Sequence, residues 1–157
     1  MARQLALGGA RVVAVDLRPL PSPIAGVRFV QGDMLRLPAF GEAPFDIILC
    51  QRAIHYLPYA RACHVVQALC ALLRVEGRLY LSASGLNSEL GAGYRASPLI
   101  ERHHELCPEM AEKHNIFGPV CLYEEGDMQF LLEKNGFVVE QLFVSPFGNI
   151  KAVARPR

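Results

Sequence analysis

The chain has 157 residues, which suits a single domain, and 52% of them are hydrophobic and 20% charged, as in globular proteins. Sixteen basic and fifteen acidic residues give a net charge of +1, which argues against a large nucleic-acid-binding surface. The mean hydropathy is +0.21, yet no apolar run approaches the ~18 residues of a spanning helix, and the N-terminal apolar stretch is too short for a secretory signal. We therefore expect one cytoplasmic domain, residues 1–157, that does not bind a membrane.

Short apolar runs alternate with helical patterns, which is typical of an α/β protein with a parallel sheet. The first nine residues look like the end of a helix that stops at Gly8 and Gly9. Six strands are expected, and the link between the last two is short enough for an antiparallel hairpin. In chain order the expected strands cover residues 11–16, 27–31, 45–50, 78–82, 136–144 and 149–154.

Three helices are expected after the third and fourth strands. Apolar residues recur at helical spacing over residues 62–73. Ser97 and Pro98 suit the N-cap and first turn of a second helix, which would end before Pro108. The third includes the apolar positions of residues 128–132 and stops at an Asn-Gly pair.

The five cysteines form no C-x-x-C pair, and their odd number suits no closed disulfide framework. His103 and His104 lie close to Cys107, which leaves a structural zinc site as an alternative. Adjacent histidines point to opposite sides of a helix, so at most one of them joins Cys107 on a face. We expect the cysteines to act mainly as small hydrophobic residues, with no bound metal.

Two acidic residues, Asp16 and Asp33, stand at the carboxyl ends of consecutive expected strands. In open α/β sheets, ligands bind outside these strand ends. A carboxylate there can accept hydrogen bonds from both hydroxyls of a ribose, and a second carboxylate can accept one from an adenine amino group. The alternative is that both residues only terminate strands, as Asp does in many turns.

The sequence resembles the class I S-adenosylmethionine-dependent methyltransferases over about residues 3–155. The segments that carry the resemblance, with the C-terminal helix and hairpin, are GARVVAVD (9–16), VRFVQGDMLRLP (27–38), FDIILCQRAIHYL (45–57) and LLRVEGRLYL (72–81). The last is similar to the family's leucine-arginine-proline-glycine-glycine turn, with Val75 and Glu76 in place of two of its residues. The resemblance implies a Rossmann-like α/β fold, mostly parallel with a C-terminal antiparallel hairpin, and a candidate substrate lid at about residues 84–125.

The resemblance also implies the cofactor S-adenosyl-L-methionine. Asp16 would accept hydrogen bonds from the ribose hydroxyls, and Asp33 would accept one from the adenine amino group. Cys50 and Gln51 would flank its methionine part. The expected cofactor-binding residues are thus Asp16, Leu17, Asp33, Met34, Cys50 and Gln51.

Methyl transfer is an in-line displacement, and it needs a general base only if the acceptor atom is protonated. His55 and Tyr56 are the catalytic candidates, with the alternative that they only begin a helix. Arg52, Tyr94 and His103 are the substrate candidates. Arg52 suits a carboxylate on the acceptor, although a surface salt bridge would explain it equally well.

The family's first strand and glycine-rich loop precede the helix with which this sequence opens, so we expect the sheet to lack its first strand. Two alternatives to a competent methyltransferase follow. In the first, the chain is a non-catalytic methyltransferase-like module for binding or oligomerisation. In the second, it is a truncated product that does not bind the cofactor.

The acceptor is expected to be a small molecule and not nucleic acid. Relatives that methylate amino groups of bases or glutamine side chains carry an Asn or Asp, two prolines and an aromatic residue after the third strand, whereas residues 50–53 here read CQRA. A nicotinamide-dependent dehydrogenase would also place an acid at Asp16, but it gives no reason for Asp33. A homodimer is left open.

Overall fold

The computed structural model describes residues 1–40 and 44–157, with side chains described outside 38–43. The chain forms two compact units, Met1–Gly41 and Glu42–Arg157. The elements of the first unit are α1 (Ala2–Leu7), β1 (Val12–Asp16), β2 (Val27–Gln31) and the 3-10 helix η1 (Met34–Phe40). Those of the second unit are β3 (Phe45–Gln51), η2 (Ile54–Tyr56), α2 (Tyr59–Leu72), β4 (Leu73–Ser84), η3 (Glu89–Gly91), η4 (Leu99–Glu101), α3 (Pro108–His114), α4 (Glu125–Lys134), β5 (Phe137–Val144) and β6 (Asn149–Pro156).

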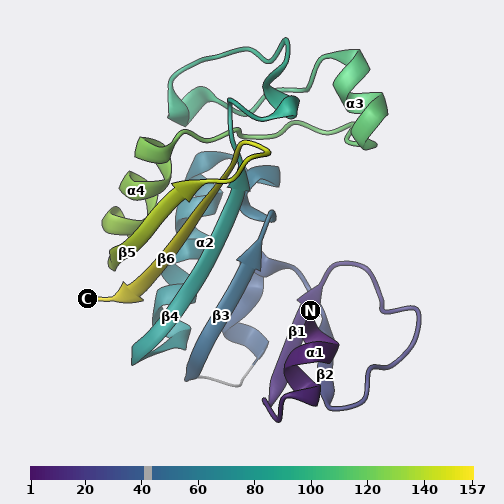
Figure 1. Cartoon of the computed structure of the whole chain (residues 1–157), viewed down its shortest axis with the longest axis vertical. Helices are drawn as coiled ribbons and strands as arrows, with labels where there is room; N and C mark the ends of the chain where they lie inside the picture. Colours follow the sequence, from purple (N-terminus) through teal and green to yellow (C-terminus); the bar gives the residue numbers. More distant parts are fainter. Residues whose placement is uncertain (41–43) are drawn as a thin grey trace. The chain divides into compact units, whose positions relative to one another are not determined.

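The first unit is a parallel strand pair covered by a short helix. β1 and β2 pair from Val12 opposite Val27 to Asp16 opposite Gln31, and α1 contacts both strands (Figure 1). The helix ends at Leu7 with Gly8 as its C-cap, and Gly9 follows at a φ of +87°, a backbone conformation that glycine adopts without steric cost. The expected opening helix and the first two strands are therefore confirmed.

The second unit contains a four-stranded sheet in the order β3-β4-β6-β5. β3 and β4 run parallel, whereas β6 is antiparallel to both β4 and β5. The last two strands thus form the expected antiparallel hairpin. α2 and α4 contact the sheet and each other, and they lie behind it in Figure 1.

The core of the second unit lies between these two helices and the sheet. The helices contribute apolar side chains at spacings of three and four, and the strands contribute alternate residues. The largest fully buried side chains include Val65, Val66, Leu79, Leu81, Met128, Leu131, Leu132 and Phe137. Among the described helices, none combines the length and apolar character that a membrane span requires.

The helix expected from residue 98 to residue 107 was predicted wrongly. Only the three residues of η4 are helical there, and α3 instead begins at Pro108. A proline fits the first turn of a helix because its φ is preset and its missing N–H is not needed there. His104 and Val120 also exchange backbone hydrogen bonds of 3.0 and 2.8 Å, which uses groups that a helix would need.

The boundary between the first long helix and the fourth strand also differs from the expectation. α2 ends at Leu72, and Leu73 already begins β4, which is longer than expected. Leu73 is an apolar residue that is buried as part of β4. Its apolar side chain therefore extended the helical pattern by one residue.

Residues 85–124, here called the connecting segment, join β4 to α4 and lie beyond the end of the sheet at which β4 finishes (Figure 1). The segment has a small apolar core of its own, made of Leu90, Tyr94, Leu106, Met110, Val120 and Leu122. It therefore keeps a defined shape although it contains little regular secondary structure.

Candidate functional site

The two carboxylates expected to bind a nucleoside lie at the carboxyl ends of β1 and β2. The Asp16 Oδ1 atom accepts a hydrogen bond of 2.9 Å from the Arg18 backbone N–H, and the Asp33 Oδ1 atom accepts one of 2.9 Å from the Leu35 N–H. These are the turns that the alternative explanation predicted. Each carboxylate nevertheless keeps a second oxygen that has no partner among the described residues. The two carboxylates can therefore shape the turns and still accept hydrogen bonds from a ligand.

Apolar side chains accompany these carboxylates. Leu17 follows Asp16 and has 62% of its surface exposed, and its backbone carbonyl accepts a hydrogen bond of 3.1 Å from the Gln31 side chain. Met34 follows Asp33 and is half-buried. This end of the first unit thus combines free hydrogen-bond acceptors with apolar surface, which suits an adenosine group that donates from its hydroxyl and amino groups.

In the second unit, a polar cluster fixes the carboxyl end of β3. The Ser82 hydroxyl donates a hydrogen bond of 3.1 Å to Gln51 Oε1 and accepts one of 3.1 Å from the Arg52 backbone N–H. The same N–H also donates to the Ser82 carbonyl at 2.9 Å. Arg52 is held at a φ of +49°, a conformation that is costly for residues with a Cβ atom.

Cys50 precedes this cluster and is half-buried, and burial raises the pKa of its thiol to about 11. The thiol is therefore protonated at neutral pH and behaves as a small apolar side chain. Gln51 is exposed, but its amide group is already engaged with Ser82 and, at 3.5 Å, with the Tyr80 carbonyl. Cys50 and Gln51 remain predicted neighbours of the methionine part of the cofactor.

The catalytic candidates His55 and Tyr56 lie in η2, and their ring centroids are 4.2 Å apart. His55 is fully buried, and neither ring nitrogen has a hydrogen-bond partner among the described residues. Burial and, second, the positive charge of Arg52 lower the pKa of His55 to about 4, so the imidazole is neutral at pH 7. Tyr56 has 48% of its surface exposed and can reach a ligand directly.

A cavity of about 600 Å³ opens beside Arg52, within the second unit. Its walls come from the carboxyl ends of β3 and β4, the connecting segment and the turn between β5 and β6. We call it the Arg52 pocket. The residues that line it include Arg52, Ser84, Asn87, Glu89, His114 and Phe147. Of these residues, only Arg52 could be identified from the sequence. The one available signal for Phe147 was an aromatic residue inside a Ser-Pro-Phe-Gly turn.

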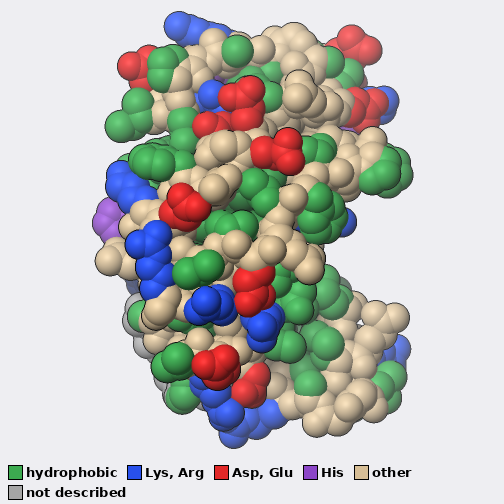
Figure 2. All heavy atoms as spheres, turned by 60° about the vertical axis from the view of Figure 1, so that its left-hand side comes forward, with side chains coloured by type: hydrophobic (Ala, Val, Ile, Leu, Met, Phe, Trp, Pro, Cys, Tyr) green, Lys and Arg blue, Asp and Glu red, His purple; other side chains and the backbone are tan. Residues whose placement is uncertain are grey.

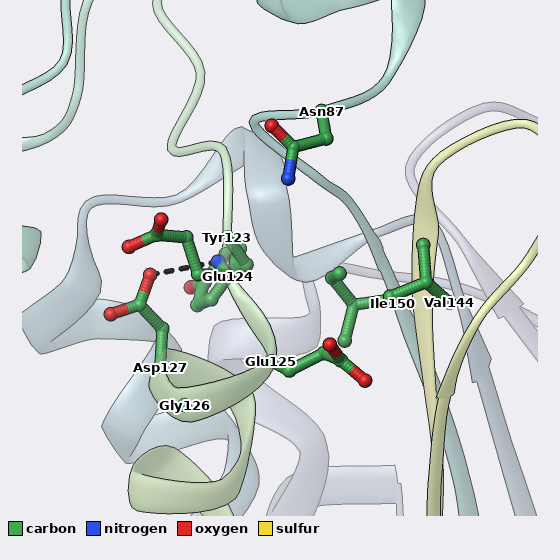
Figure 3. Close-up of a pocket in the computed structure, with 8 residues that line it drawn as sticks. All are labelled: Asn87, Tyr123, Glu124, Glu125, Gly126, Asp127, Val144 and Ile150. Atoms are coloured by element: carbon green, nitrogen blue, oxygen red, sulfur yellow. Dashed lines mark hydrogen bonds between the residues drawn. The ribbon is translucent and has the colours of Figure 1, made fainter.

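A second hollow, of about 420 Å³, lies at the start of α4 (Figure 3). Two of its three acidic residues cap the helix, because the Glu124 N–H donates to Asp127 Oδ2 at 2.8 Å and the Glu124 side chain accepts from the N–H of Asp127. Tyr123 lies at its floor, and burial raises the pKa of this hydroxyl. This hollow is thus explained by the helix cap.

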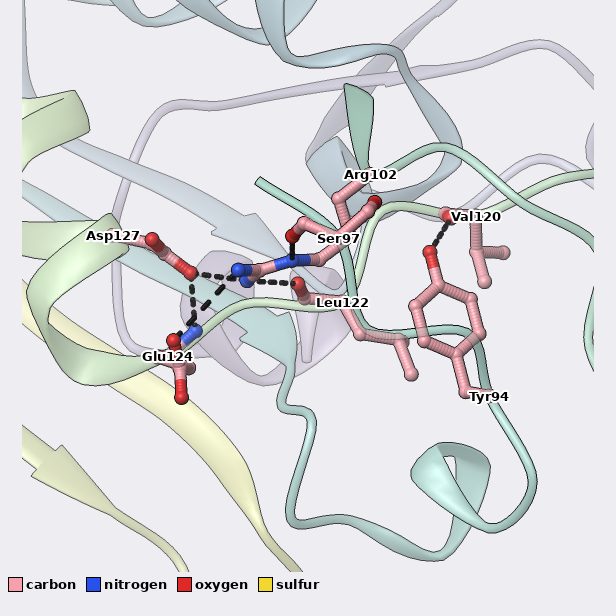
Figure 4. A network of polar contacts seen from close by, with 7 residues as sticks. All are labelled: Tyr94, Ser97, Arg102, Val120, Leu122, Glu124 and Asp127. Carbon is pink, nitrogen blue, oxygen red and sulfur yellow. Dashed lines mark hydrogen bonds and ion pairs between the residues drawn. The ribbon is translucent and has the colours of Figure 1, made fainter. Parts of the chain in front are cut away.

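Arg102 ties the connecting segment to α4 (Figure 4). Its guanidinium donates to the carbonyls of Ser97 and Leu122, at 2.8 and 3.1 Å, and to Asp127 Oδ2 at 2.5 Å. Only 8% of the Arg102 side chain and 16% of the Asp127 side chain are exposed. The network is a structural clasp that holds residues far apart in the chain.

The two substrate candidates of the connecting segment lie outside the lining of the Arg52 pocket. The Tyr94 ring belongs to the small apolar core, and its hydroxyl donates a hydrogen bond of 2.6 Å to the Val120 carbonyl (Figure 4). His103 is half-buried, and its Nε2 atom has no hydrogen-bond partner among the described residues. Their contact with a substrate remains a prediction.

The candidate zinc ligands have other neighbours. His104 Nε2 lies 2.9 Å from the Ser97 hydroxyl, and Cys107 Sγ lies 3.2 Å from the Ala92 carbonyl. In residues 1–40 and 44–157, no three His, Cys, Asp or Glu side chains are grouped so that they could hold a metal ion. On the face shown in Figure 2, acidic and basic side chains are interspersed, in keeping with the balanced charge of the chain.

Comparison with known proteins places this geometry in context. A family model described as a methyltransferase domain matches residues 1–81. No curated protein matches the sequence. Among solved structures, the PH0226 protein from Pyrococcus horikoshii is 17% identical with a TM-score of 0.75, and the match covers 98% of this chain and 75% of that one.

Two further solved structures are enzymes. The 1,6-didemethyltoxoflavin-N1-methyltransferase of Burkholderia thailandensis, with 1,6-didemethyltoxoflavin and S-adenosylhomocysteine bound, is 23% identical with a TM-score of 0.69, and the match covers 94% of this chain and 62% of that one. The magnesium protoporphyrin IX methyltransferase of Synechocystis, with S-adenosylhomocysteine bound, is 16% identical with a TM-score of 0.65. That match covers 99% of this chain and 68% of the other. This chain thus spans between 62% and 75% of the length of the three structures, and the likeness establishes a Rossmann-like fold.

Proposed function

Because this chain belongs to the methyltransferase domain family, we propose that it transfers the methyl group of S-adenosyl-L-methionine to a small-molecule acceptor. The observation that carries the proposal is the pair of carboxylates at the ends of β1 and β2. Asp16 and Asp33 each keep an oxygen without a partner, beside the apolar surface of Leu17 and Met34. This arrangement fits the ribose and adenine of the cofactor, which supplies an electrophilic methyl group when it is bound.

In this proposal each strand end has its own task. Asp16 accepts hydrogen bonds from the ribose hydroxyls and Asp33 accepts one from the adenine amino group, as in the family that the sequence resembles. Cys50 and Gln51, at the end of β3, adjoin the methionine part of the cofactor. The Cys50 thiol stays protonated, so it adds no charge and does not compete as a nucleophile.

The acceptor is proposed to bind next to Arg52, under the cover of the connecting segment. Two of the similar structures are, by their names, methyltransferases of toxoflavin and protoporphyrin compounds, and both compounds are small organic molecules. Tyr56 is exposed and would contact the acceptor, whereas His55 is buried and would hold the Tyr56 ring in place. Because His55 is neutral, Arg52 is the charged side chain of these two that an acceptor would meet.

The test is to mix the chain with S-adenosyl-L-methionine and a panel of small organic acceptors, and to measure S-adenosylhomocysteine by mass spectrometry. We expect product above the enzyme-free background with at least one acceptor, and much less after Asp16→Asn when the cofactor is below saturation. Binding of S-adenosylhomocysteine without turnover on any acceptor would instead favour a non-catalytic binding module, and no binding at all would contradict the proposal.

A further inference from the structure

The Arg52 pocket contains one cationic side chain without a partner. No hydrogen bond or ion pair holds the Arg52 guanidinium among the described residues, although its backbone is fixed by two bonds to Ser82. A residue at a φ of +49° persists only when its surroundings impose that conformation, and such residues concentrate at functional sites. The strained turn therefore presents the side chain at the end of β3.

The only carboxylate among the pocket-lining residues is already neutralised. Glu89 forms an ion pair with Lys113, whose hydrogen bond lowers the pKa of Glu89, and the Glu89 carboxylate lies 3.1 Å from His114 Nε2. Glu89 is thus ionised but has its own cationic partner, Lys113. Arg52 remains as the uncompensated charge of the lining, so the pocket favours an anionic ligand.

The pocket also contains a buried polar atom that lacks a partner. The Ser84 hydroxyl, at the end of β4, is 1% exposed and forms no hydrogen bond with any described residue. A buried hydroxyl without a partner costs free energy unless a ligand or water satisfies it. The exposed Asn87 amide adds a further donor and acceptor to the same lining.

An aromatic residue, Phe147, also belongs to the lining of the pocket. Phe147 is 81% exposed, although it lies in a turn whose backbone is closely fixed. Gly148 has a φ of +74°, and a Cβ atom at this position would lie 2.5 Å from Ser88 Cα. The Gly148 carbonyl also accepts a hydrogen bond of 3.2 Å from the Gly85 N–H. The turn thus holds an exposed phenyl ring at the pocket, where the ring can stack with a ligand ring.

We propose that the Arg52 pocket binds an aromatic carboxylate as the methyl acceptor, with the carboxylate on Arg52 and the ring against Phe147. The planar guanidinium matches a carboxylate with two parallel hydrogen bonds. The exposed Asn87 amide then meets a polar substituent of the ring. The role of this ligand as methyl acceptor rests on the proposed function, whereas binding of the aromatic acid does not depend on methyl transfer.

The experiment is saturation-transfer NMR on the full chain with benzoate, 4-hydroxybenzoate, 2-naphthoate and indole-3-acetate, each compared with its primary amide. We expect at least one acid to bind about tenfold more tightly than its amide, as a charge-assisted bidentate bond requires. Arg52→Gln should remove this preference. Arg61→Gln, which changes an exposed arginine of α2, should keep it.

A second variant separates the ring from the charge. Phe147→Ala should weaken the binding of acids and amides alike by about fivefold, because it removes a stacking surface and no charge. Binding of no acid in the panel, or equal binding of acids and amides, would overturn the inference.

The carboxylate of the cofactor is the other anion that Arg52 could bind, and a titration distinguishes the two. Arg52→Gln should leave the affinity for S-adenosylhomocysteine unchanged within about twofold. An equal loss for S-adenosylhomocysteine and for the acids would assign Arg52 to the cofactor and overturn the inference. Acid binding without any methylation would contradict the proposed function alone, and methylation of only uncharged acceptors would contradict this inference alone.

Discussion

Arg52 combines backbone strain with an unpaired charge, and the two can be separated by substitution. Replacing Arg52 by Gly removes the Cβ atom that makes a φ of +49° costly, so the free energy of unfolding should rise by about 1 kcal/mol. Arg52→Gln keeps the Cβ atom and should give no such gain. Thermal unfolding measures the difference, which should be about 2–4 °C in Tm. Equal Tm values for the two variants would show that the turn is not strained.

His55 makes the stability of the chain depend on pH. Its pKa is lowered from 6.5 to about 4 in the folded protein, first by burial and second by Arg52. Between these two values the unfolded chain binds a proton that the folded chain does not, so stability falls as the pH falls from 6.5 toward 4. His55 contributes up to about 3 kcal/mol to this loss.

The contribution of His55 is measured by urea unfolding at pH 7 and pH 4.5, for the unchanged chain and for His55→Gln. The unchanged chain should lose about 2–3 kcal/mol more than the variant between the two pH values. The carboxylates titrate in both proteins, so the comparison cancels their effect. The same pH dependence in both proteins would contradict a buried neutral imidazole.

At the scale of elements, the Arg102 clasp joins the connecting segment to α4. Removal of one partner of a buried pair leaves the other charge without compensation, so Arg102→Ala should lower the free energy of unfolding by about 3 kcal/mol. The exposed pair of Arg74 and Asp46, at 2.9 Å, is the matched control. Arg74→Ala should cost no more than about 1 kcal/mol, as is typical of surface pairs.

Chemical denaturation with matched m-values measures both changes. Hydrogen exchange then tests where the Arg102 variant opens, and faster exchange should concentrate in the connecting segment and the first turn of α4. Similar losses for Arg102→Ala and Arg74→Ala would show that the network in Figure 4 does not hold the segment.

Elements with a strong local pattern could be predicted from the sequence, and those fixed by distant contacts could not. The strand Val27–Gln31 and the end of α4 at Lys134 follow from β-branched residues and an Asn-Gly stop. The helix expected before Pro108 does not form, because His104 pairs with Val120, sixteen positions further along the chain. No local pattern in residues 98–107 indicates that partner.

At the scale of the whole molecule, the sequence indicated the family through the order of its segments. The carboxylates Asp16 and Asp33 could be identified because Asp16 is the last residue of β1 and Asp33 comes two residues after β2. The Arg52 pocket could not, since Ser84, His114 and Phe147 come from a strand, a helix and a turn that only the fold brings together. Single residues of this kind carry no motif, so their chemistry becomes visible only in three dimensions.

The central claim is that Asp16 belongs to a cofactor site, and calorimetric titration of the chain with S-adenosylhomocysteine tests it most directly. We predict binding that Asp16→Asn weakens at least about tenfold, because a charged acceptor of ribose hydroxyl groups is lost. Asp46→Asn, which changes another exposed carboxylate, should bind like the unchanged chain. No heat of binding from a folded chain, or equal affinity in all three proteins, would contradict the account.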